Sequence, residues 1–406
     1  MNQHDLLSRA KELAPELTAH RRHLHACPEI GFDLPQTTAY VKAQLEAMGY
    51  TPQPCGRSGL VALAGGKQPG KVFLLRADMD ALPIREEAEV DFAAQNGSMH
   101  ACGHDLHTAM LLGAARLLKE REEEIPGTVK LMFQPAEEII LGAVDMLEDG
   151  LLENPKVDAA MMIHAIAATP APPGTVVVSA PGVSAPAADY FTITVRGRGC
   201  HGSSPNTGVD PLTAAAHILI ALQELHAREL AMGDRAALTI GTFHGGTADN
   251  AIPDAAVLGG SMRAFSEETR VFLKGRLTDM ATGIAAAFRE SAEVAFGAST
   301  PCLDNDEALT TAAHRYAVEL LGEDMALSAA ALGGLGEGAP KMSGSEDFAY
   351  VSQRVPSVML ALAAGQPQQG HRYPQHHPSV TFDEEALPYG AAIYAHLAMR
   401  WLEDNG

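Results

Sequence analysis

The hydrophobic pattern of the first third of the chain alternates between helical and strand spacing. Apolar positions recur every three or four residues in three segments, which predicts helices at Leu6–Ala26, Thr37–Met48 and Thr108–Glu120. Short apolar runs predict buried strands at Lys71–Arg76, Thr128–Phe133 and Val157–Ile163. Strands that alternate with helices indicate a mostly parallel sheet covered on both faces.

The pattern changes after Pro170–Pro186, a segment rich in Pro, Ala and Gly that we interpret as a crossing between domains. The following elements have the order β-α-β-β-α-β, which is the ferredoxin-like arrangement. They are strand Tyr190–Arg196, helix Asp210–Leu230, strands Ala237–Phe243 and Ala255–Ala264, helix Glu267–Ser291 and strand Glu293–Ala298. These roughly 110 residues suit one small independent domain.

From Cys302 the earlier alternation returns. It predicts helices at Asp306–Leu321, Asp347–Gln353 and Asp383–Leu402, and a strand at Ser357–Ala361. The simplest organisation is one α/β domain made of residues 1–187 and 301–406, with a ferredoxin-like domain, residues 188–300, inserted into it. A length of 406 residues agrees with more than one domain.

Composition and charge exclude several function classes. The chain has 29 Lys and Arg against 50 Asp and Glu, and its net charge of −21 disfavours nucleic acids and anionic membranes as partners. We recognise no apolar stretch long enough to cross a membrane and no secretory signal core. The 5 Cys are odd in number and scattered, which favours free thiols and a cytoplasmic location.

The densest cluster of chemical side chains is Met99–His107, which we place in a loop just before helix Thr108–Glu120. Cys102 and His104 stand two residues apart, and thiolate with imidazole suits zinc and similar transition metals. The alternative is that the cluster only caps the helix and buries its imidazoles. Both interpretations stay open on this motif alone.

Acidic pairs follow two of the predicted strands. Glu137 and Glu138 follow strand Thr128–Phe133, and Asp78 and Asp80 follow strand Lys71–Arg76. Open α/β sheets bind ligands at the carboxyl ends of their strands, so one Glu can bind metal while its neighbour carries a proton. A solvated helix start and a plain turn are the alternatives.

Two further elements contain histidine: His164 after an apolar run, and the loop Gln375-His376-His377-Pro378. Each is weak evidence by itself. Together with the other clusters they supply five metal ligands, which exceeds one closed tetrahedral site and fits two ions about 3.5–4 Å apart. These ligands are Cys102, His104, Glu138, His164 and His376.

Five motifs in this order give the chain a family resemblance. It resembles the metallopeptidase-like amidohydrolases that include hippurate hydrolase, indole-acetyl-amino-acid hydrolase and bacterial N-acyl-amino-acid amidohydrolases, and the resemblance covers nearly the whole chain. The motifs are Arg76-Ala-Asp-Met-Asp-Ala-Leu-Pro83, Met99-His-Ala-Cys-Gly-His-Asp105, Phe133-Gln-Pro-Ala-Glu-Glu138, Gly344-Ser-Glu-Asp-Phe348 and His376-His-Pro378.

The resemblance implies a zinc-exopeptidase-like catalytic domain with a binuclear site. The five residues named above would be its ligands, and His376 is preferred to His377 because the family ligand stands two residues before Pro. Glu137 would be the general base and acid, and Asp80 the supporting acid. The metals would be Mn²⁺, Zn²⁺ or Co²⁺, because ligand type does not choose between them.

The inserted domain would be a lid that also forms a homodimer. His201 matches a lid His that reaches the partner's active site, Asn250 a lid residue near the substrate, and Arg263 a lid Arg for a substrate carboxylate. Each has a simpler alternative, namely turn capping, turn closure or a surface ion pair. The chain departs from the family at Cys200, Ile139–Leu141 and Ala165–Pro173, which bears on the reach of His201 and the width of the pocket.

We therefore predict a metal-dependent amidohydrolase that cleaves N-acyl amino acids with a metal-activated water. One alternative is a dipeptidase or carboxypeptidase on the same scaffold. Another is a thiol hydrolase with Cys102 as nucleophile and His104 or His107 as base. A non-catalytic ligand-binding protein is a third alternative, although the chain retains all five ligands and Glu137.

Overall fold

The computed structural model describes residues 3–332 and 344–406, and the chain divides into two compact units. The first unit comprises Met1–Ser184, Asp304–Lys341 and Asp347–Gly406. The second comprises Ala185–Leu303 and Met342–Glu346. Within the described ranges, no helix combines the length and apolar character that crossing a bilayer requires.

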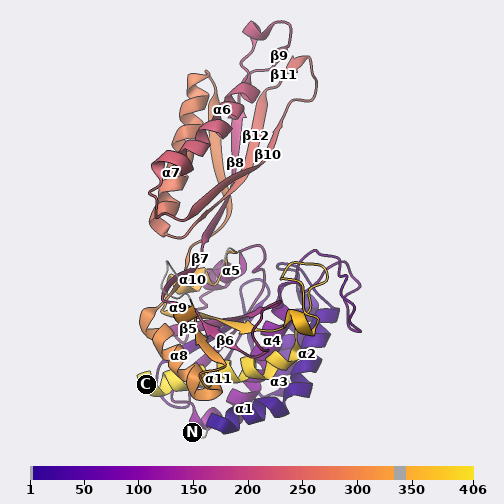
Figure 1. Ribbon diagram of the computed structural model, residues 1–406, viewed down its shortest axis with the longest axis vertical. Coiled ribbons are helices and arrows are strands. Elements are labelled where there is room, and N and C mark those ends of the chain that lie inside the picture. The colour runs from indigo at the N-terminus through magenta and orange to yellow at the C-terminus, as the bar shows by residue number, and fades with distance from the viewer. Residues whose placement is uncertain (1–2, 333–343) are drawn as a thin grey trace. The chain divides into compact units, whose positions relative to one another are not determined.

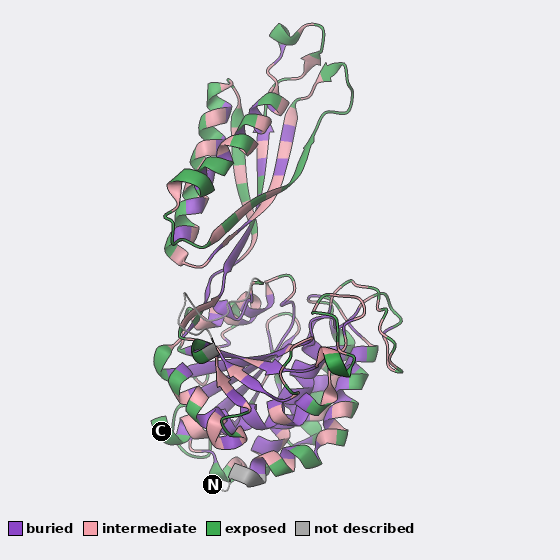
Figure 2. Ribbon diagram, in the orientation of Figure 1, coloured by how far each residue is buried: buried purple, intermediate pink, exposed green. Residues whose placement is uncertain are grey.

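The first unit contains a mixed, mostly parallel sheet of eight strands. β3 lies between β4 and β5, and β5 lies between β3 and β16, all in parallel register. Nearly every residue of these four strands is buried, as expected for a parallel sheet covered on both faces (Figure 2). In spatial order the strands are β1 (Gln53–Cys55), β2 (Gly59–Gly65), β4 (Thr128–Gln134), β3 (Val72–Asp78), β5 (Ala159–Ile166), β16 (Ser357–Ala363), β6 (Val176–Val178) and β15 (Ala326–Ser328).

Helices from both ends of the chain cover this sheet, and the indigo N-terminal helices lie beside the yellow helix α11 in Figure 1. Gly113 lets three helices approach closely, because a Cβ there would lie 2.5 Å from Leu17 and 2.9 Å from Ala391. The helices are α1 (Gln3–Glu12), α2 (Ala14–Ala26), α3 (Pro35–Ala47), α4 (His104–Glu120), α5 (Gly142–Glu148), α8 (Glu307–Leu321), α9 (Ala329–Leu332), α10 (Ala349–Ser352) and α11 (Leu387–Asn405).

The structure corrects some predicted bounds. The predicted helix Leu6–Ala26 is two helices that meet at Leu13, because Pro15 at the start of α2 has no N–H to continue the ladder. Helix α4 begins at His104 rather than Thr108, after Gly103 in the left-handed region (φ 91°). His104 and His107 therefore lie in the first turn of a helix and not in the predicted loop.

Other segments were not predicted at all. Strands β1 and β2 and helix α5 are absent from the predicted elements, and the predicted crossing segment contains β6 and β7 (Gly182–Ala185). β7 pairs with β14 (Leu303–Asn305). β1, β6 and β7 have three or four residues, too few to show a hydrophobic period, whereas β2 is a seven-residue apolar strand that the prediction missed.

The second unit confirms the ferredoxin-like prediction. Its antiparallel sheet has the order β10-β12-β8-β13, and α6 and α7 contribute to one apolar core with it (Figure 1). The elements are β8 (Ala187–Arg196), α6 (Pro211–Glu224), β10 (Ala236–Gly245), β12 (Ala255–Ala264), α7 (Glu267–Ala287) and β13 (Ser291–Thr300). β9 (Cys200–His201) and β11 (Ala251–Ile252) form a small separate ladder.

Candidate metal centre

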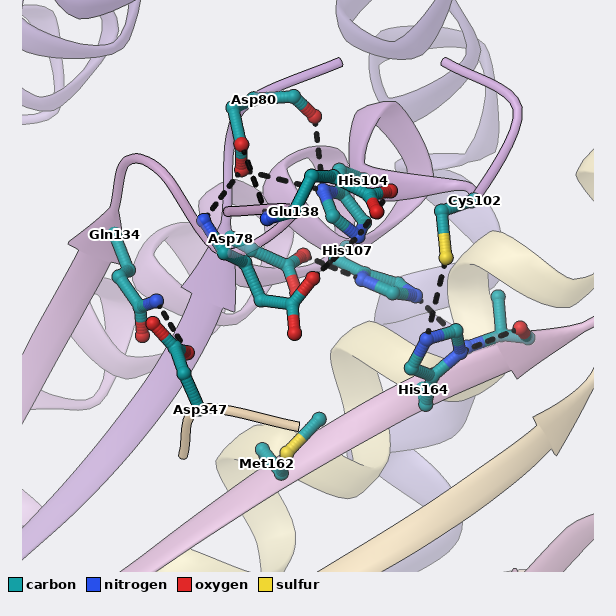
Figure 3. A network of polar contacts seen from close by, with 12 residues as sticks. Asp78, Asp80, Cys102, His104, His107, Gln134, Glu138, Met162, His164 and Asp347 are labelled. Carbon is teal, nitrogen blue, oxygen red and sulfur yellow. Dashed lines mark hydrogen bonds and ion pairs between the residues drawn. The ribbon is translucent and has the colours of Figure 1, made fainter. Parts of the chain in front are cut away.

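The predicted site residues of the first unit gather where strands β3, β4 and β5 end and helix α4 begins (Figure 3). Asp78 is the last residue of β3, and Glu137 and Glu138 follow β4 after a turn in which Ala136 is left-handed (φ 56°). His104 is the first residue of α4. This edge of a parallel sheet is the usual place for a ligand site.

The Asp80 carboxylate orients the Glu pair. Its two oxygens accept hydrogen bonds from the backbone N–H groups of Glu137 and Glu138, at 3.0 and 3.2 Å. The Asp80 carbonyl oxygen also accepts a hydrogen bond from Nδ1 of His104, at 2.8 Å. One residue therefore ties the ends of β3 and β4 to the start of α4.

Hydrogen bonds define the proton positions on two buried histidines. Nδ1 of His104 donates to the Asp80 carbonyl, and Nδ1 of His164 donates to the Ala165 carbonyl at 2.8 Å. A carbonyl oxygen only accepts, so Nδ1 carries a proton in both rings and Nε2 is the nitrogen left for a metal ion. His164 Nε2 lies 3.6 Å from the Cys102 sulfur. His104 Nε2 is buried and has no hydrogen-bond partner.

The five predicted ligands form two groups of three that share Cys102. One group is Cys102, His104 and His164, and the other is Cys102, Glu138 and His376. Within each group the ligand atoms lie within 4.8 Å of one another. Four of the five side chains are largely buried, whereas His376 is 53% exposed.

The His376 backbone is left-handed (φ 66°), and its N–H donates to the Ala101 carbonyl at 2.9 Å. Its Nε2 lies 3.7 Å from the Glu138 carboxylate. His377 instead stacks on Tyr373, and its Nδ1 accepts a hydrogen bond from the Ser379 N–H. His376 is thus the member of the His pair that meets the other predicted ligands.

The electrostatics of the site favour an added cation. Burial is the main cause that raises the pKa of the Glu138 carboxyl to about 7; the Asp80 and Asp78 carboxylates also raise this pKa, whereas His104 lowers it. Burial lowers the pKa of His104, but the nearby Asp78 and the hydrogen bond to Asp80 outweigh this and raise it well above the usual value. Glu138 Oε1 and His104 Nε2 are both buried without hydrogen-bond partners. Both pKa shifts favour positive charge at the site, which a metal ion would supply in place of a proton, and sulfur, nitrogen and oxygen donors fit transition-metal ions.

A thiol nucleophile does not fit the same geometry. Burial raises the pKa of the Cys102 thiol, which opposes formation of the thiolate. The ring nitrogens of His107 are both engaged, Nδ1 with Asp78 at 2.6 Å and Nε2 with the Ala165 N–H at 2.8 Å. His107 is therefore placed to hold structure and not to accept a proton from Cys102.

The three predicted lid residues lie in the second unit. His201 Nδ1 accepts a hydrogen bond from the Ser203 N–H at 3.1 Å. Arg263, on β12, donates to the Tyr190 hydroxyl at 3.3 Å. The backbone carbonyl of Asn250 accepts from the Gly202 N–H. Their roles remain predictions.

Arg76 and Asp347 were quoted in the motifs without a function, and the structure places both fully buried behind the site. Arg76 donates to Asp78 at 2.6 Å, to Gln134 at 2.9 Å and to Asp347 at 3.1 Å. The signal in the sequence is an arginine inside an otherwise apolar buried strand, because such a cation needs buried carboxylates around it.

Comparison with known proteins identifies the family. Residues 74–400 match Peptidase family M20/M25/M40. The chain is 36% identical over 402 residues to N-acetyl-L-cysteine deacetylase of Bacillus subtilis (strain 168), covering 97% of this chain and 90% of that protein. It is 36% identical over 391 residues to IAA-amino acid hydrolase ILR1-like 2 of Arabidopsis thaliana, covering 95% and 85%.

A solved structure agrees over nearly the whole length. The Bacillus subtilis YXEP protein, described as a dinuclear metal binding peptidase from the M20 family, matches with a TM-score of 0.79 and 33% identity, covering 97% of this chain and 99% of that one. These matches confirm the family resemblance and the fold class. The chain therefore belongs to Peptidase family M20/M25/M40, and it is a metal-dependent amidohydrolase of that family.

Proposed function

We propose that this enzyme hydrolyses the amide bond of N-acyl amino acids with two divalent transition-metal ions, Mn²⁺, Zn²⁺ or Co²⁺. The residues that would hold the ions are Cys102, His104 and His164 in one group and Cys102, Glu138 and His376 in the other. The observation that carries the proposal is the pair of three-residue groups that share Cys102. The dinuclear description of the YXEP protein supports two ions.

Bound ions of this kind polarise an amide carbonyl and make water more acidic. The Glu137 carboxylate lies 4.0 Å from His104 Nε2 and belongs to neither three-residue group that contains Cys102. We assign Glu137 as the general base that takes a proton from the attacking water. It then gives this proton to the leaving nitrogen as the C–N bond breaks, which releases an acid and an amine. Asp80 holds the Glu137 backbone in place for both steps.

The substrate class rests on the relatives. One is named for removal of acetyl from N-acetyl-L-cysteine and another for hydrolysis of IAA-amino acid conjugates, and both names describe an acyl group on an amino acid. Ile139 is 41% exposed directly after the Glu pair, which supports an apolar contact for the acyl group. The alternative is a dipeptidase or carboxypeptidase, and free dipeptides would then be cleaved faster than N-acyl amino acids.

We propose that the second unit supplies the remaining substrate contacts and forms a homodimer. His201 would stabilise the oxyanion in the partner's site, Asn250 would lie near the substrate, and Arg263 would bind its carboxylate. The edge strand β10 has no buried residue along its length, which supports pairing with a second copy. If sedimentation shows a monomer and an assay shows that this monomer has full activity, the role of His201 is contradicted. Five free thiols support a cytoplasmic location.

The variant Glu137→Gln tests the proposed reaction. We expect metal content to match the wild type while turnover of N-acetyl- and N-benzoyl-amino acids falls by more than about 100-fold, the usual contribution of general acid–base catalysis. Turnover near the wild-type rate with full metal content would refute the assignment of Glu137. Wild-type protein without transition metal, and without activation by Mn²⁺, Zn²⁺ or Co²⁺, would refute the metal site.

A further inference from the structure

The backbone N–H and C=O of Ala165 lie at the end of β5 where that strand loses one neighbour. β3 pairs with β5 only as far as the partners Arg76 and Met162. Beyond Met162, side chains take the place of the missing strand. The Tyr394 hydroxyl accepts from the Ile163 N–H at 3.1 Å, and two residues later the Ala165 N–H donates to His107 Nε2 at 2.8 Å.

The Ala165 carbonyl oxygen accepts two further side chains. His164 Nδ1 donates to it at 2.8 Å, and Gln375 Nε2 donates to it at 2.9 Å. Because a carbonyl oxygen has two lone pairs, these bonds use its whole capacity. The backbone N–H and C=O of this one residue are therefore bound by three side chains, and one of these side chains belongs to a proposed ligand.

The proton on His107 follows from its partners. A backbone N–H only donates, so His107 Nε2 is the acceptor and Nδ1 carries the proton that goes to Asp78. His107 therefore has no lone pair left for a metal, although it lies close to Asp78 and His104. Its bonds instead connect the end of β3 to the end of β5.

Gln375 makes the corresponding connection for the other ligand group. It directly precedes His376, whose left-handed backbone needs support from its surroundings. Two bonds flank this position, from the His376 N–H to the Ala101 carbonyl and from the Gln375 amide to the Ala165 carbonyl. The first hydrogen bond reaches Ala101, which precedes Cys102. The second reaches Ala165, which follows His164.

We propose that the Ala165 backbone is a shared anchor for both metal positions, with His107 acting through its N–H and Gln375 through its C=O as positioning residues. His107 holds the strand end that carries His164, and Gln375 holds the loop that carries His376. This inference rests on the proposed metal ligands. It predicts that loss of the hydrogen bond of either His107 or Gln375 to Ala165 weakens metal binding and lowers kcat. KM should change little, because neither residue is assigned a contact with the substrate.

The test measures Mn²⁺ binding directly. Chelator-treated protein is dialysed against a series of free Mn²⁺ concentrations, and Mn²⁺ per chain is measured by elemental analysis, alongside kcat, KM and the melting temperature of the metal-free protein. Gln375→Leu removes the hydrogen bond to the Ala165 carbonyl. Gln366→Leu is the matched control, because Gln366 Nε2 donates to another backbone carbonyl, that of Pro170, at 2.7 Å.

We expect Gln375→Leu to bind one of two Mn²⁺ equivalents at least about tenfold more weakly, with kcat reduced and the melting temperature of the metal-free protein unchanged. Gln366→Leu should match the wild type in every measurement. Two equivalents bound by Gln375→Leu with wild-type affinity and wild-type kcat would overturn the role of Gln375. Wild-type protein that binds no Mn²⁺, Zn²⁺ or Co²⁺ would instead overturn the proposed metal site.

Two variants separate the bonds of His107. In His107→Gln the side-chain oxygen can occupy the position of Nε2 and accept the Ala165 N–H, whereas in His107→Asn the amide nitrogen can replace only Nδ1 and reach Asp78. We expect His107→Gln to retain Mn²⁺ affinity closer to the wild type than His107→Asn does. The reverse order would show that the bond to Asp78 matters and would overturn the anchor role of Ala165.

Discussion

The buried imidazole of His25 gives the free energy of unfolding a pH dependence whose sign follows from its contacts. His25 lies between two carboxylates, with Nδ1 2.9 Å from Asp105 and Nε2 3.0 Å from Glu86. Burial lowers the His25 pKa, but the charges and hydrogen bonds of Asp105 and Glu86 raise it to about 9. The folded protein therefore holds this proton more tightly than the unfolded chain, whose histidine pKa is about 6.5.

The size of the effect follows from this difference. One pKa unit corresponds to about 1.4 kcal/mol, so the protonated His25 stabilises the folded state by about 3 kcal/mol below pH 6.5. This contribution is about 2 kcal/mol at pH 7.5 and disappears as the pH rises through about 9. The sign is that of a raised histidine pKa: stability is lost at high pH and not at low pH.

Equilibrium urea unfolding of the metal-free protein measures this pH dependence of the free energy of unfolding. The wild type and His25→Asn are compared in EDTA at pH 5.5, 7.5 and 9.5, so that titration of groups remote from His25 cancels in the difference. We expect the difference in free energy of unfolding between the wild type and the variant to be about 3 kcal/mol larger at pH 5.5 than at pH 9.5. A difference that stays constant over this range would refute the raised pKa of His25.

Three further predictions concern packing, charge and metal. Arg76→Met should lower the free energy of unfolding by about 3–5 kcal/mol, because it leaves the carboxylates of Asp78 and Asp347 buried without their cation; urea unfolding measures this, and a loss below about 1 kcal/mol would contradict the importance of the network. Gly113→Ala should destabilise the helix packing by about 1–3 kcal/mol, because its methyl group would overlap Leu17; an unchanged melting temperature would show that the helices move apart freely. Chelation should lower both activity and melting temperature, and added Mn²⁺, Zn²⁺ or Co²⁺ should restore both; activity that survives complete removal of metal would contradict the proposed centre.

The sequence predicts the fold class well because both units depend on regular apolar periodicity. The central strands β3, β4 and β5 and the antiparallel insert all have strong hydrophobic patterns, and all were anticipated. The edge strand β1 was not, because its three residues are too few to produce a clear pattern, whereas β2 is a seven-residue apolar strand inside the sheet that the prediction missed. The start of α4 was misplaced because Gly103 permits a sharp entry into the helix that propensity alone does not indicate.

The candidate site, too, could be predicted from the sequence only in part. The predicted ligands are chemically distinctive residue types in short motifs, so they stand out in the sequence. The residues that orient them do not, because the roles of His107 and Gln375 arise from the backbone N–H and C=O of one residue, Ala165, at the end of β5. No local pattern encodes a bond between residue 375 and residue 165, and only the folded chain reveals it.

The position of β16 has a consequence for biosynthesis. This strand lies between β5 and β6 in the sheet, yet it is synthesised after the entire second unit, and His376 follows later still. On the ribosome, the second unit has all of its strands available before the first unit receives its missing interior strand. The nascent chain must therefore keep a gap beside β5 open until its last quarter emerges, and it cannot acquire a complete metal-binding pocket before that moment.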